Sequence, residues 1–272
     1  MANTIQITGT GGIIEGNLGS ANVNVNLDDV LNFDGVDDKI DTNINMSTAF
    51  DGAFTVSMWI KPTDGRPSSS QKLFGTKNGG NTNWVQAEIT TAGELGFYYE
   101  SNNNATEAET EDIIFADGEA PWTHVSFVAD GSNLKIYVNG VEKTLQSGKN
   151  GSMSGITMGD FSTSDDVFIG CRNNAGSGNA FYAGYIADFR VQNSALTATT
   201  GIQTLASKIN VDYTLVNSTQ PSAWYKLTNN DTSNSGSGGG TPTVTGTTRV
   251  YDAFSVDVYD GYDGSDATTR TT

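Results

Sequence analysis

Residues 121–145 read PWTHVSFVADGSNLKIYVNGVEKTL, and their pattern decides the fold class of the chain. Apolar side chains alternate with other residues at 123–127 and again at 134–138, which is the period of half-buried strands. Asn139-Gly140 follows the second run, and both residue types tolerate the positive φ of a two-residue type I′ hairpin turn. The stretch therefore predicts three consecutive antiparallel strands.

Four further blocks share this strand-like character and keep a regular order along the chain. They are LNFDGVDDKIDT at 31–42, FTVSMWIKP at 54–62, VFIGCRNN at 167–174 and FYAGYIADFRVQNSALTAT at 181–199. Together with 121–145 they resemble the laminin-G-like, concanavalin A-like lectin jelly-roll domains, in the branch that includes pentraxins. The resemblance implies an all-β, two-sheet antiparallel β-sandwich. It does not imply one function, since this fold hosts lectins, adhesion modules, glycanases and structural virion domains.

Composition limits the partners of the chain. Its 272 residues include 31 Asp and Glu against 14 Lys and Arg, a formal net charge of -17. Binding of nucleic acid needs clustered basic residues, so we predict no nucleic-acid partner. No apolar run approaches the length that spans a bilayer, so we predict no membrane insertion.

The chain has one cysteine, Cys171, which rules out an intrachain disulfide. The opening MANTIQITGTGG lacks a basic segment followed by an apolar one, so we expect no signal peptide. A protein of this kind is used inside a cell or leaves by another route, such as inside a virion. The first seven residues are also similar to the openings of tailed-phage fibre and appendage proteins.

We expect three parts along the chain. The first part, residues 1–30, forms an N-terminal β arm, or alternatively the first strands of the sandwich and a flexible tip. The second part, residues 31–230, forms the laminin-G-like domain. The third part, residues 231–272, forms a Gly/Ser-rich loop and a C-terminal β segment with an acidic tail. Both termini thus add β segments to the sandwich. Residues 194–208 hold the only helix that we predict, and 101–112 are polar enough for a solvated loop or an irregular edge.

Catalysis is not indicated. Glycanases on this sandwich resemble one another in a Glu-x-Asp-x-(x)-Glu strand, and the densest acidic run, Glu107, Glu109 and Glu111, lacks the central Asp. His124, the only histidine, lies within a predicted strand, where a structural role is favoured over that of a catalytic base. We therefore predict that the protein is not an enzyme.

Calcium is the cofactor for which the sequence offers ligands, because this hard cation prefers carboxylate and carbonyl oxygens. The candidate metal ligands are Asp34, Asp37 and Asp38, and further acidic groups occur at 165–166 and at 257–263. Solvated turn aspartates are the alternative at each place. The position of the acidic pentraxin loop reads CRNNAGSG at 171–178, which departs from the calcium-binding pattern of that family.

Carbohydrate binding needs exposed aromatic rings that stack on the CH faces of sugars, with amides or carboxylates nearby for the hydroxyls. The candidates beside Asn-rich loops are Trp84, Tyr98, Tyr99 and Tyr182. The alternative is that these rings fill the core or cover a sheet.

These observations favour a non-enzymatic protein of the virion surface: a capsid decoration, fibre or tail-appendage protein of a bacteriophage. It would contact itself, as a trimer, and other virion proteins, and its lectin-like domain would bind host surface glycans. The alternative is a secreted or cell-surface bacterial carbohydrate-binding or adhesion module with structural calcium. A glycan hydrolase is the third hypothesis.

Overall fold

The computed structural model describes residues 7–9, 12–14, 23–24, 30–161, 165–229, 231–250 and 257–258. The chain forms two compact units, of which one is Asp29–Val250 and the other combines Met1–Asp28 with Tyr251–Thr272. Within the described part of the second unit, β1 (Ile7–Gly9) pairs with β2 (Gly12–Ile14), and β3 (Val23–Asn24) pairs with β22 (Asp257–Val258). Extra β segments therefore occur at both ends, while the predicted division into three parts stays a prediction.

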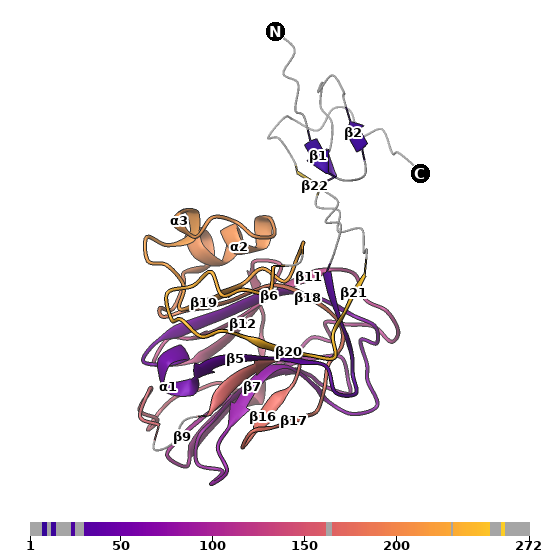
Figure 1. The fold of residues 1–272 in the computed structure, drawn as a ribbon. Coiled ribbons are helices and arrows are strands. Elements are labelled where there is room, and N and C mark those ends of the chain that lie inside the picture. Colours follow the sequence, from indigo (N-terminus) through magenta and orange to yellow (C-terminus); the bar gives the residue numbers. More distant parts are fainter. Residues whose placement is uncertain are drawn as a thin grey trace. The chain divides into compact units, whose positions relative to one another are not determined.

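The unit Asp29–Val250 is a sandwich of two sheets, so the predicted all-β, two-sheet architecture is confirmed (Figure 1). The larger sheet has the order β14-β10-β9-β8-β7-β15-β5-β20, with the hairpin β16-β17 joined to β7. Its strands are β5 (Lys39–Asn45), β7 (Gln71–Lys77), β8 (Trp84–Ile89), β9 (Leu95–Ser101), β10 (Asn104–Thr110), β14 (Leu145–Asn150), β15 (Asp166–Ile169), β16 (Arg172–Asn174), β17 (Ser177–Asn179) and β20 (Thr243–Thr245).

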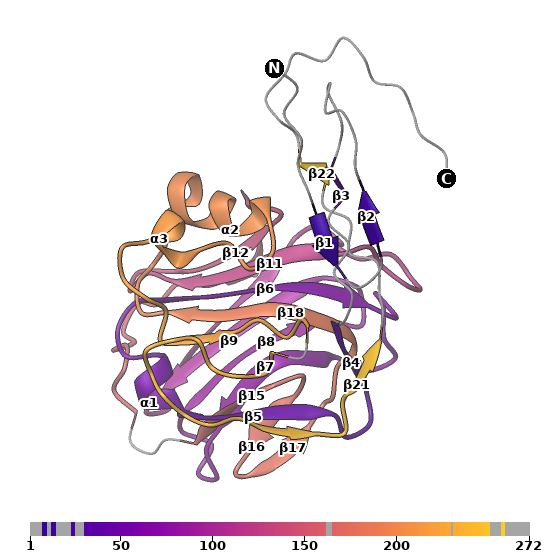
Figure 2. The same cartoon turned by 45° about the horizontal axis from the view of Figure 1, so that its top comes forward.

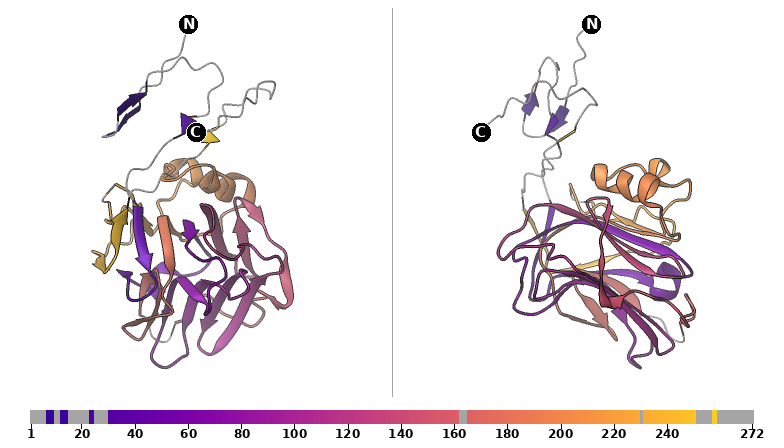
Figure 3. Two further views of the ribbon diagram at one scale, coloured as in Figure 1. Left: turned by 90° about the vertical axis from the view of Figure 1, so that its right-hand side faces the viewer. Right: turned by 180° about the vertical axis from the view of Figure 1, so that it is seen from behind.

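The smaller sheet lies opposite, with the order β13-β12-β11-β6-β18-β4-β21 and β19 added beside β18 (Figure 3). Its strands are β4 (Val30–Asp34), β6 (Phe54–Pro62), β11 (Thr123–Ala129), β12 (Leu134–Val138), β13 (Val141–Glu142), β18 (Ala183–Gln192), β19 (Ala223–Tyr225) and β21 (Thr248–Val250). Strands β11, β12 and β13 are the predicted meander. Asn139 and Gly140 have φ of 48° and 81°, so this turn has the two positive φ values expected of it.

The core lies between the sheets and is rich in aromatic rings. Phe74 of β7 contacts Phe127 of β11 and Phe189 of β18 edge-on, with ring centroids 6.0 and 5.8 Å apart. Phe54 packs on Phe97 in the same geometry at 6.1 Å. Burying each such side chain stabilises the fold by roughly 1.5–3 kcal/mol, which lets a chain with a single cysteine hold two sheets together.

Short helices cover the outer face of the smaller sheet (Figure 2). They are the π-helical turn η1 (Ala198–Ile202), α2 (Gln203–Ser207) and α3 (Tyr213–Val216). Ile202 and Leu205 pack with Val128 and Tyr137 of the sheet in a second apolar cluster. A helix at 194–208 is confirmed, but the expectation that it is the only one is wrong, because α3 and α1 (Met46–Ala49) are also present.

Residues 101–112, expected to form a solvated loop or an irregular edge, contain a regular strand. Residues 104–110 form β10 between β9 and β14, with Ala108 and Glu109 buried. Residues 172–179 form the hairpin β16-β17. Among the described residues no helix is long and apolar enough to cross a membrane.

Candidate functional site

The outer face of the larger sheet carries polar and aromatic side chains. Along β8, the side chains of Val85, Ala87 and Ile89 are buried in the core. Because successive side chains of a strand point to opposite faces, Trp84 and Gln86 lie on the outer side. The same alternation on neighbouring strands extends this surface across the sheet.

Strand register decides which side chains meet on this surface. Trp84 pairs with Lys77 of β7 and with Glu100 of β9, and Gln86 pairs with Tyr98. Residues directly opposite each other share a face of the sheet. We call this surface the Trp84 face; it comprises Lys72, Lys77, Trp84, Gln86, Glu88, Tyr98, Glu100, Glu107 and Arg172.

Trp84 is half-buried and contacted on several sides. Its ring centroid lies 4.7 Å from that of Tyr98, and its indole Nε1 donates a hydrogen bond of 2.7 Å to Gln86 Oε1. Lys77 Nζ lies 4.3 Å from the ring centroid and Arg172 Cζ lies 4.6 Å from it, within the range of cation–π attraction. The ring is therefore held in one orientation by neighbours on its own sheet and on β16.

Arg172 reaches the Trp84 face because β16 adds to β7 in parallel, with Asn173 opposite Thr76. The hairpin β16-β17 fixes the guanidinium, whose Nε donates to Asn179 Oδ1 at 3.0 Å. Its Nη1 donates to Gln86 Oε1 at 3.2 Å. Sequence reasoning missed Arg172, since the long-range parallel pairing of β16 with β7 has no local signal.

Tyr98 supplies a second half-exposed ring, with a polar end that is also held. Its hydroxyl donates a hydrogen bond of 2.9 Å to Glu100 Oε2. Burial and this hydrogen bond to a carboxylate raise the pKa of Tyr98 well above its ordinary value of 10.0. The phenol therefore stays neutral and remains a donor at every working pH.

The carboxylates of β10 that the hydrolase hypothesis requires are engaged in ion pairs. Lys149 Nζ lies 2.5 Å from Glu109 Oε2 and 3.4 Å from Glu107 Oε1. Glu109 is buried, and the shared lysine of β14 links the two strands. These ion pairs give the acidic strand a structural explanation.

Two of the four aromatic candidates lie in the core, so assigning them to glycan contact is wrong. Tyr99 and Tyr182 are each 0% exposed. Tyr99 follows Tyr98 directly, so the alternation that exposes Tyr98 buries its neighbour, whose hydroxyl accepts a hydrogen bond from Gly159 N. Tyr182 packs beside Phe33. Trp84 and Tyr98 remain candidates.

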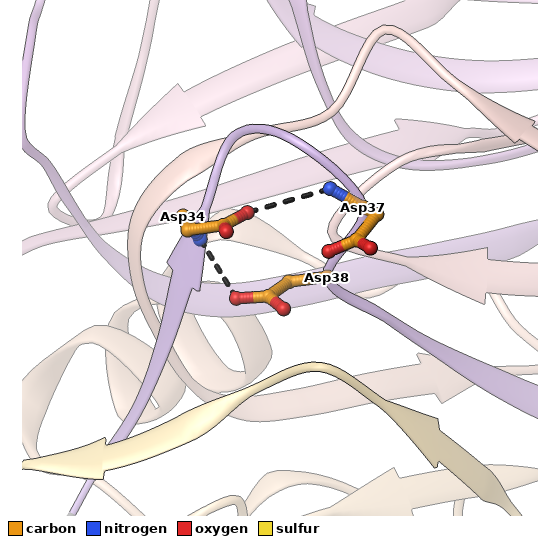
Figure 4. Close-up of side chains that lie close together, drawn as sticks. All are labelled: Asp34, Asp37 and Asp38. Carbon is orange, nitrogen blue, oxygen red and sulfur yellow. Dashed lines mark hydrogen bonds between the residues drawn. The ribbon is translucent and has the colours of Figure 1, made fainter.

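The three candidate metal ligands form a cluster in the turn between β4 and β5 (Figure 4). One carboxylate oxygen from each of Asp34, Asp37 and Asp38 lies within 4.8 Å of the others. Asp34 Oδ1 accepts hydrogen bonds from Val36 N and Asp37 N, and Asp38 Oδ2 accepts one from Asp34 N at 2.8 Å. Burial raises the pKa of Asp38, the Asp34 N–H opposes this rise, and the charges of Asp34 and Asp37 add to it.

These donors fit calcium in chemistry, since the ion prefers hard oxygen ligands and would offset the repulsion between the carboxylates. Asp34, Asp37 and Asp38 would hold it and tie the β4–β5 turn together. The same hydrogen bonds also satisfy a turn without an ion, because aspartate side chains commonly accept from backbone N–H groups two residues on. Calcium therefore stays a prediction. Of the other acidic groups, Asp260 and Asp263 lie outside the described residues.

The smaller sheet buries several polar side chains, among them Asp188, Arg190 and His124. Asp188 accepts hydrogen bonds from Arg190 Nε, Trp224 Nε1 and Asn210 N at 2.7, 2.8 and 2.7 Å. His124 is 1% exposed, with its ring centroid 5.3 Å from that of Trp59. Burial and the nearby Arg190 charge lower the pKa of His124 to about 3. The imidazole therefore packs as a neutral, buried ring.

A laminin G-like family model of the concanavalin A-like lectin/glucanases superfamily matches residues 34–200. The match covers more than half of the chain, so the protein belongs to the concanavalin A-like lectin/glucanases superfamily. A search of curated protein sequences finds no match.

Solved structures share the fold at low sequence identity. A Bacteroides ovatus protein to which carbohydrate binding has been ascribed is 18% identical, with a TM-score of 0.56 over 86% of this chain and 63% of that one. The match therefore spans less than two thirds of that protein's length. The heptameric SAP-like pentraxin of Limulus polyphemus is 19% identical, with a TM-score of 0.45 over 67% and 83% of the chains. The CBM40 of the Ruminococcus gnavus IT-sialidase, bound to α2,3 sialyllactose, is 18% identical, with a TM-score of 0.45 over 61% and 92%.

Proposed function

We propose that the protein is a non-enzymatic carbohydrate-binding domain that binds glycans on the Trp84 face. The observation that carries this proposal is the half-exposed aromatic pair of Trp84 and Tyr98, 4.7 Å apart, on an outward sheet surface with fixed polar neighbours. Sugar rings present CH faces to aromatic rings and hydroxyls to amides and carboxylates, and binding sites combine a few such polar groups with an apolar surface.

The polar groups of the face suit hydroxyl recognition because they are already positioned. Gln86 Oε1 accepts from both Trp84 Nε1 and Arg172 Nη1, and Glu100 accepts from Tyr98. Side chains fixed in this way lose little conformational freedom when a ligand binds. Membership of a lectin/glucanase superfamily and the fold shared with the Bacteroides ovatus protein, to which carbohydrate binding is ascribed, support the same function.

Trp84→Ala tests the proposal on a panel of immobilised glycans, with Tyr185→Ala as the matched control. Tyr185 is also a half-buried ring with a lysine above it, Lys61 at 5.4 Å, but it lies on the smaller sheet. We expect Trp84→Ala to weaken glycan binding by about tenfold or more, as for a buried aromatic anchor, and Tyr185→Ala to leave it unchanged. Equal losses in both variants, or release of reducing ends from a bound glycan, would contradict the proposal.

Two cellular settings accommodate this binding domain. A secreted or cell-surface bacterial adhesion module with structural calcium is supported by the Asp34, Asp37 and Asp38 cluster. A homotrimeric bacteriophage virion protein, displayed on the virion surface, is supported by the additional β segments at both ends of the chain. Light scattering with and without a chelator separates them: a trimer indifferent to chelation favours the virion, and a monomer destabilised by chelation favours the bacterial module.

A further inference from the structure

Lys77 and Arg172 are adjacent cations without a carboxylate partner in the described part of the chain. The lysines and arginines that do form ion pairs there are Lys61, Lys72, Lys135, Lys143, Lys149, Arg190 and Lys226. With 31 acidic residues against 14 basic ones, a carboxylate partner is the common situation for a cation in this protein. Among the described residues Lys39, Arg66 and Lys208 also form no ion pair, but Lys77 and Arg172 differ from these in lying against the same ring, Trp84.

The two charges act on each other. Burial lowers the pKa of Lys77, and the Arg172 charge lowers it further, while the Glu100 charge opposes the shift. The cations lie 4.3 and 4.6 Å from the same Trp84 centroid, so the repulsion between them is part of the folded structure. An anion between them would remove this repulsion.

The remaining acidic groups of the Trp84 face do not supply that anion. Glu88 forms an ion pair with Lys72, and Glu107 forms one with Lys149. Glu100 accepts the Tyr98 hydroxyl, and its charge attracts Lys77 without forming an ion pair with it.

The unpaired cations keep free donors. Arg172 uses Nε and Nη1 for Asn179 and Gln86, and a guanidinium has five N–H groups in all, so Nη2 remains available. Lys77 contributes an ammonium group with three donors. Guanidinium and ammonium groups together are well suited to the oxygens of a carboxylate or sulfate.

We propose that the Trp84 face selects acidic saccharides, whose carboxylate or sulfate group lies between Lys77 and Arg172 while the sugar ring contacts Trp84 and Tyr98. This inference rests on the proposed function and adds the chemical class of the ligand. In a protein of net charge -17 such selectivity depends on local cations, since the overall charge repels polyanions.

Titration calorimetry on the full chain tests the proposal with matched pairs of ligands. The pairs are 3′-sialyllactose and lactose, oligogalacturonate and its methyl ester, and a sulfated galactan and its desulfated form. The first two pairs report on carboxylate and the third on sulfate. The variants are Lys77→Ala, Lys77→Arg and Arg172→Ala, and Lys226→Ala is the matched control because its Nζ lies 5.5 Å from the Trp224 centroid, on the smaller sheet.

We expect the acidic member of at least one pair to bind at least about tenfold more tightly than its neutral partner, the typical effect of one charge-assisted hydrogen bond. Lys77→Ala and Arg172→Ala should each remove that preference, Lys77→Arg should keep most of it, and Lys226→Ala should keep all of it. Unchanged thermal melting of Lys77→Ala shows that the fold is intact, since its side chain is a surface one.

The outcomes separate the inference from the proposed function. Binding of neutral glycans without an acidic preference overturns the inference and leaves the proposed function standing. An acidic preference that survives both alanine substitutions also overturns it, because the anion then binds elsewhere. No binding to any saccharide overturns both.

Discussion

Replacing His124 by phenylalanine should make the protein more resistant to acid. The pKa of this imidazole is lowered from 6.5 to about 3 in the fold, first by burial and then by the Arg190 charge. The unfolded chain binds a proton near pH 6.5 while the folded chain stays neutral, so the stability that depends on a neutral His124 is complete above pH 6.5 and is lost as pH falls towards 3.

The size of the effect follows from the same linkage. Between these two pKa values the unfolded state holds one more proton, which lowers the free energy of unfolding by about 1.4 kcal/mol for each pH unit. From pH 7.5 to pH 5 the loss is about 2 kcal/mol. Phenylalanine keeps an aromatic ring against Trp59 and removes the titrating group, including the buried Nδ1 that has no hydrogen-bond partner among the described residues.

Urea unfolding followed by tryptophan fluorescence at several pH values between 7.5 and 5 measures the effect. The carboxylates titrate in both proteins, so the difference between wild type and His124→Phe isolates the histidine. We expect this difference to shift in favour of the variant by about 2 kcal/mol on going from pH 7.5 to pH 5. Parallel loss of stability in the two proteins would refute the reasoning and would mean that His124 becomes protonated in the folded state.

Two further outcomes follow from the buried and clustered carboxylates. Asp188→Asn should lower the free energy of unfolding by about 3–5 kcal/mol, because it leaves the buried Arg190 charge uncompensated. Adding Arg190→Met should restore part of this free energy. Urea unfolding measures both effects, and a loss under about 1 kcal/mol for Asp188→Asn would be inconsistent with a buried ion pair. Calcium at about 100 times its dissociation constant should raise the stability by about 2.7 kcal/mol if the turn aspartates hold it, and Asp37→Asn should remove that gain. Identical thermal melting in calcium and in chelator would dismiss the metal site.

The parts of the fold that local chemistry determines could be predicted from the sequence. The meander at 121–145 was predictable because alternation and Asn139-Gly140 act within a few residues. Strand β10 was not predictable, because its acidic side chains are balanced by Lys149 on β14, a partner 40 residues from Glu109. A strand whose carboxylate charges are neutralised by a lysine far away in the sequence has the same composition as a loop.

Burial of the outward-facing side chains of a strand could not be predicted from the sequence either. Along β6, the alternation predicts that Phe54 and Val56 face the core, which they do, and that Thr55 and Ser57 face outward. Thr55 and Ser57 are nevertheless 1% exposed, because the segment after β18 folds over them: Thr55 Oγ1 donates to Ser194 O and accepts from Leu196 N. Periodicity identifies a face of a sheet but not what covers it.

In the candidate site too, some residues could be predicted from local sequence and others could not. Trp84 and Tyr98 could be named from residue type and their neighbourhood, but only strand register separates Tyr98 from Tyr99. Arg172 could not be named at all, since nothing local brings β16 beside β7, whereas Lys77 comes to Trp84 through the pairing of β7 with β8. Of the two cations that would decide ligand class, Arg172 therefore depends on long-range pairing, and Lys77 depends on the register of one hairpin.

The two sheets offer an internal comparison that bears on ligand class. On the smaller sheet Arg190 stacks over Trp224 at 4.2 Å, and on the larger sheet Arg172 stacks over Trp84 at 4.6 Å. Arg190 is 3% exposed and has the carboxylate of Asp188, as a buried guanidinium requires. Arg172 keeps contact with solvent, and no carboxylate of the described chain accompanies it. The buried Arg190–Trp224 pair thus has a carboxylate from the protein, and the partly exposed Arg172–Trp84 pair has none among the described residues. This difference is expected if the anion for Arg172 arrives with a ligand.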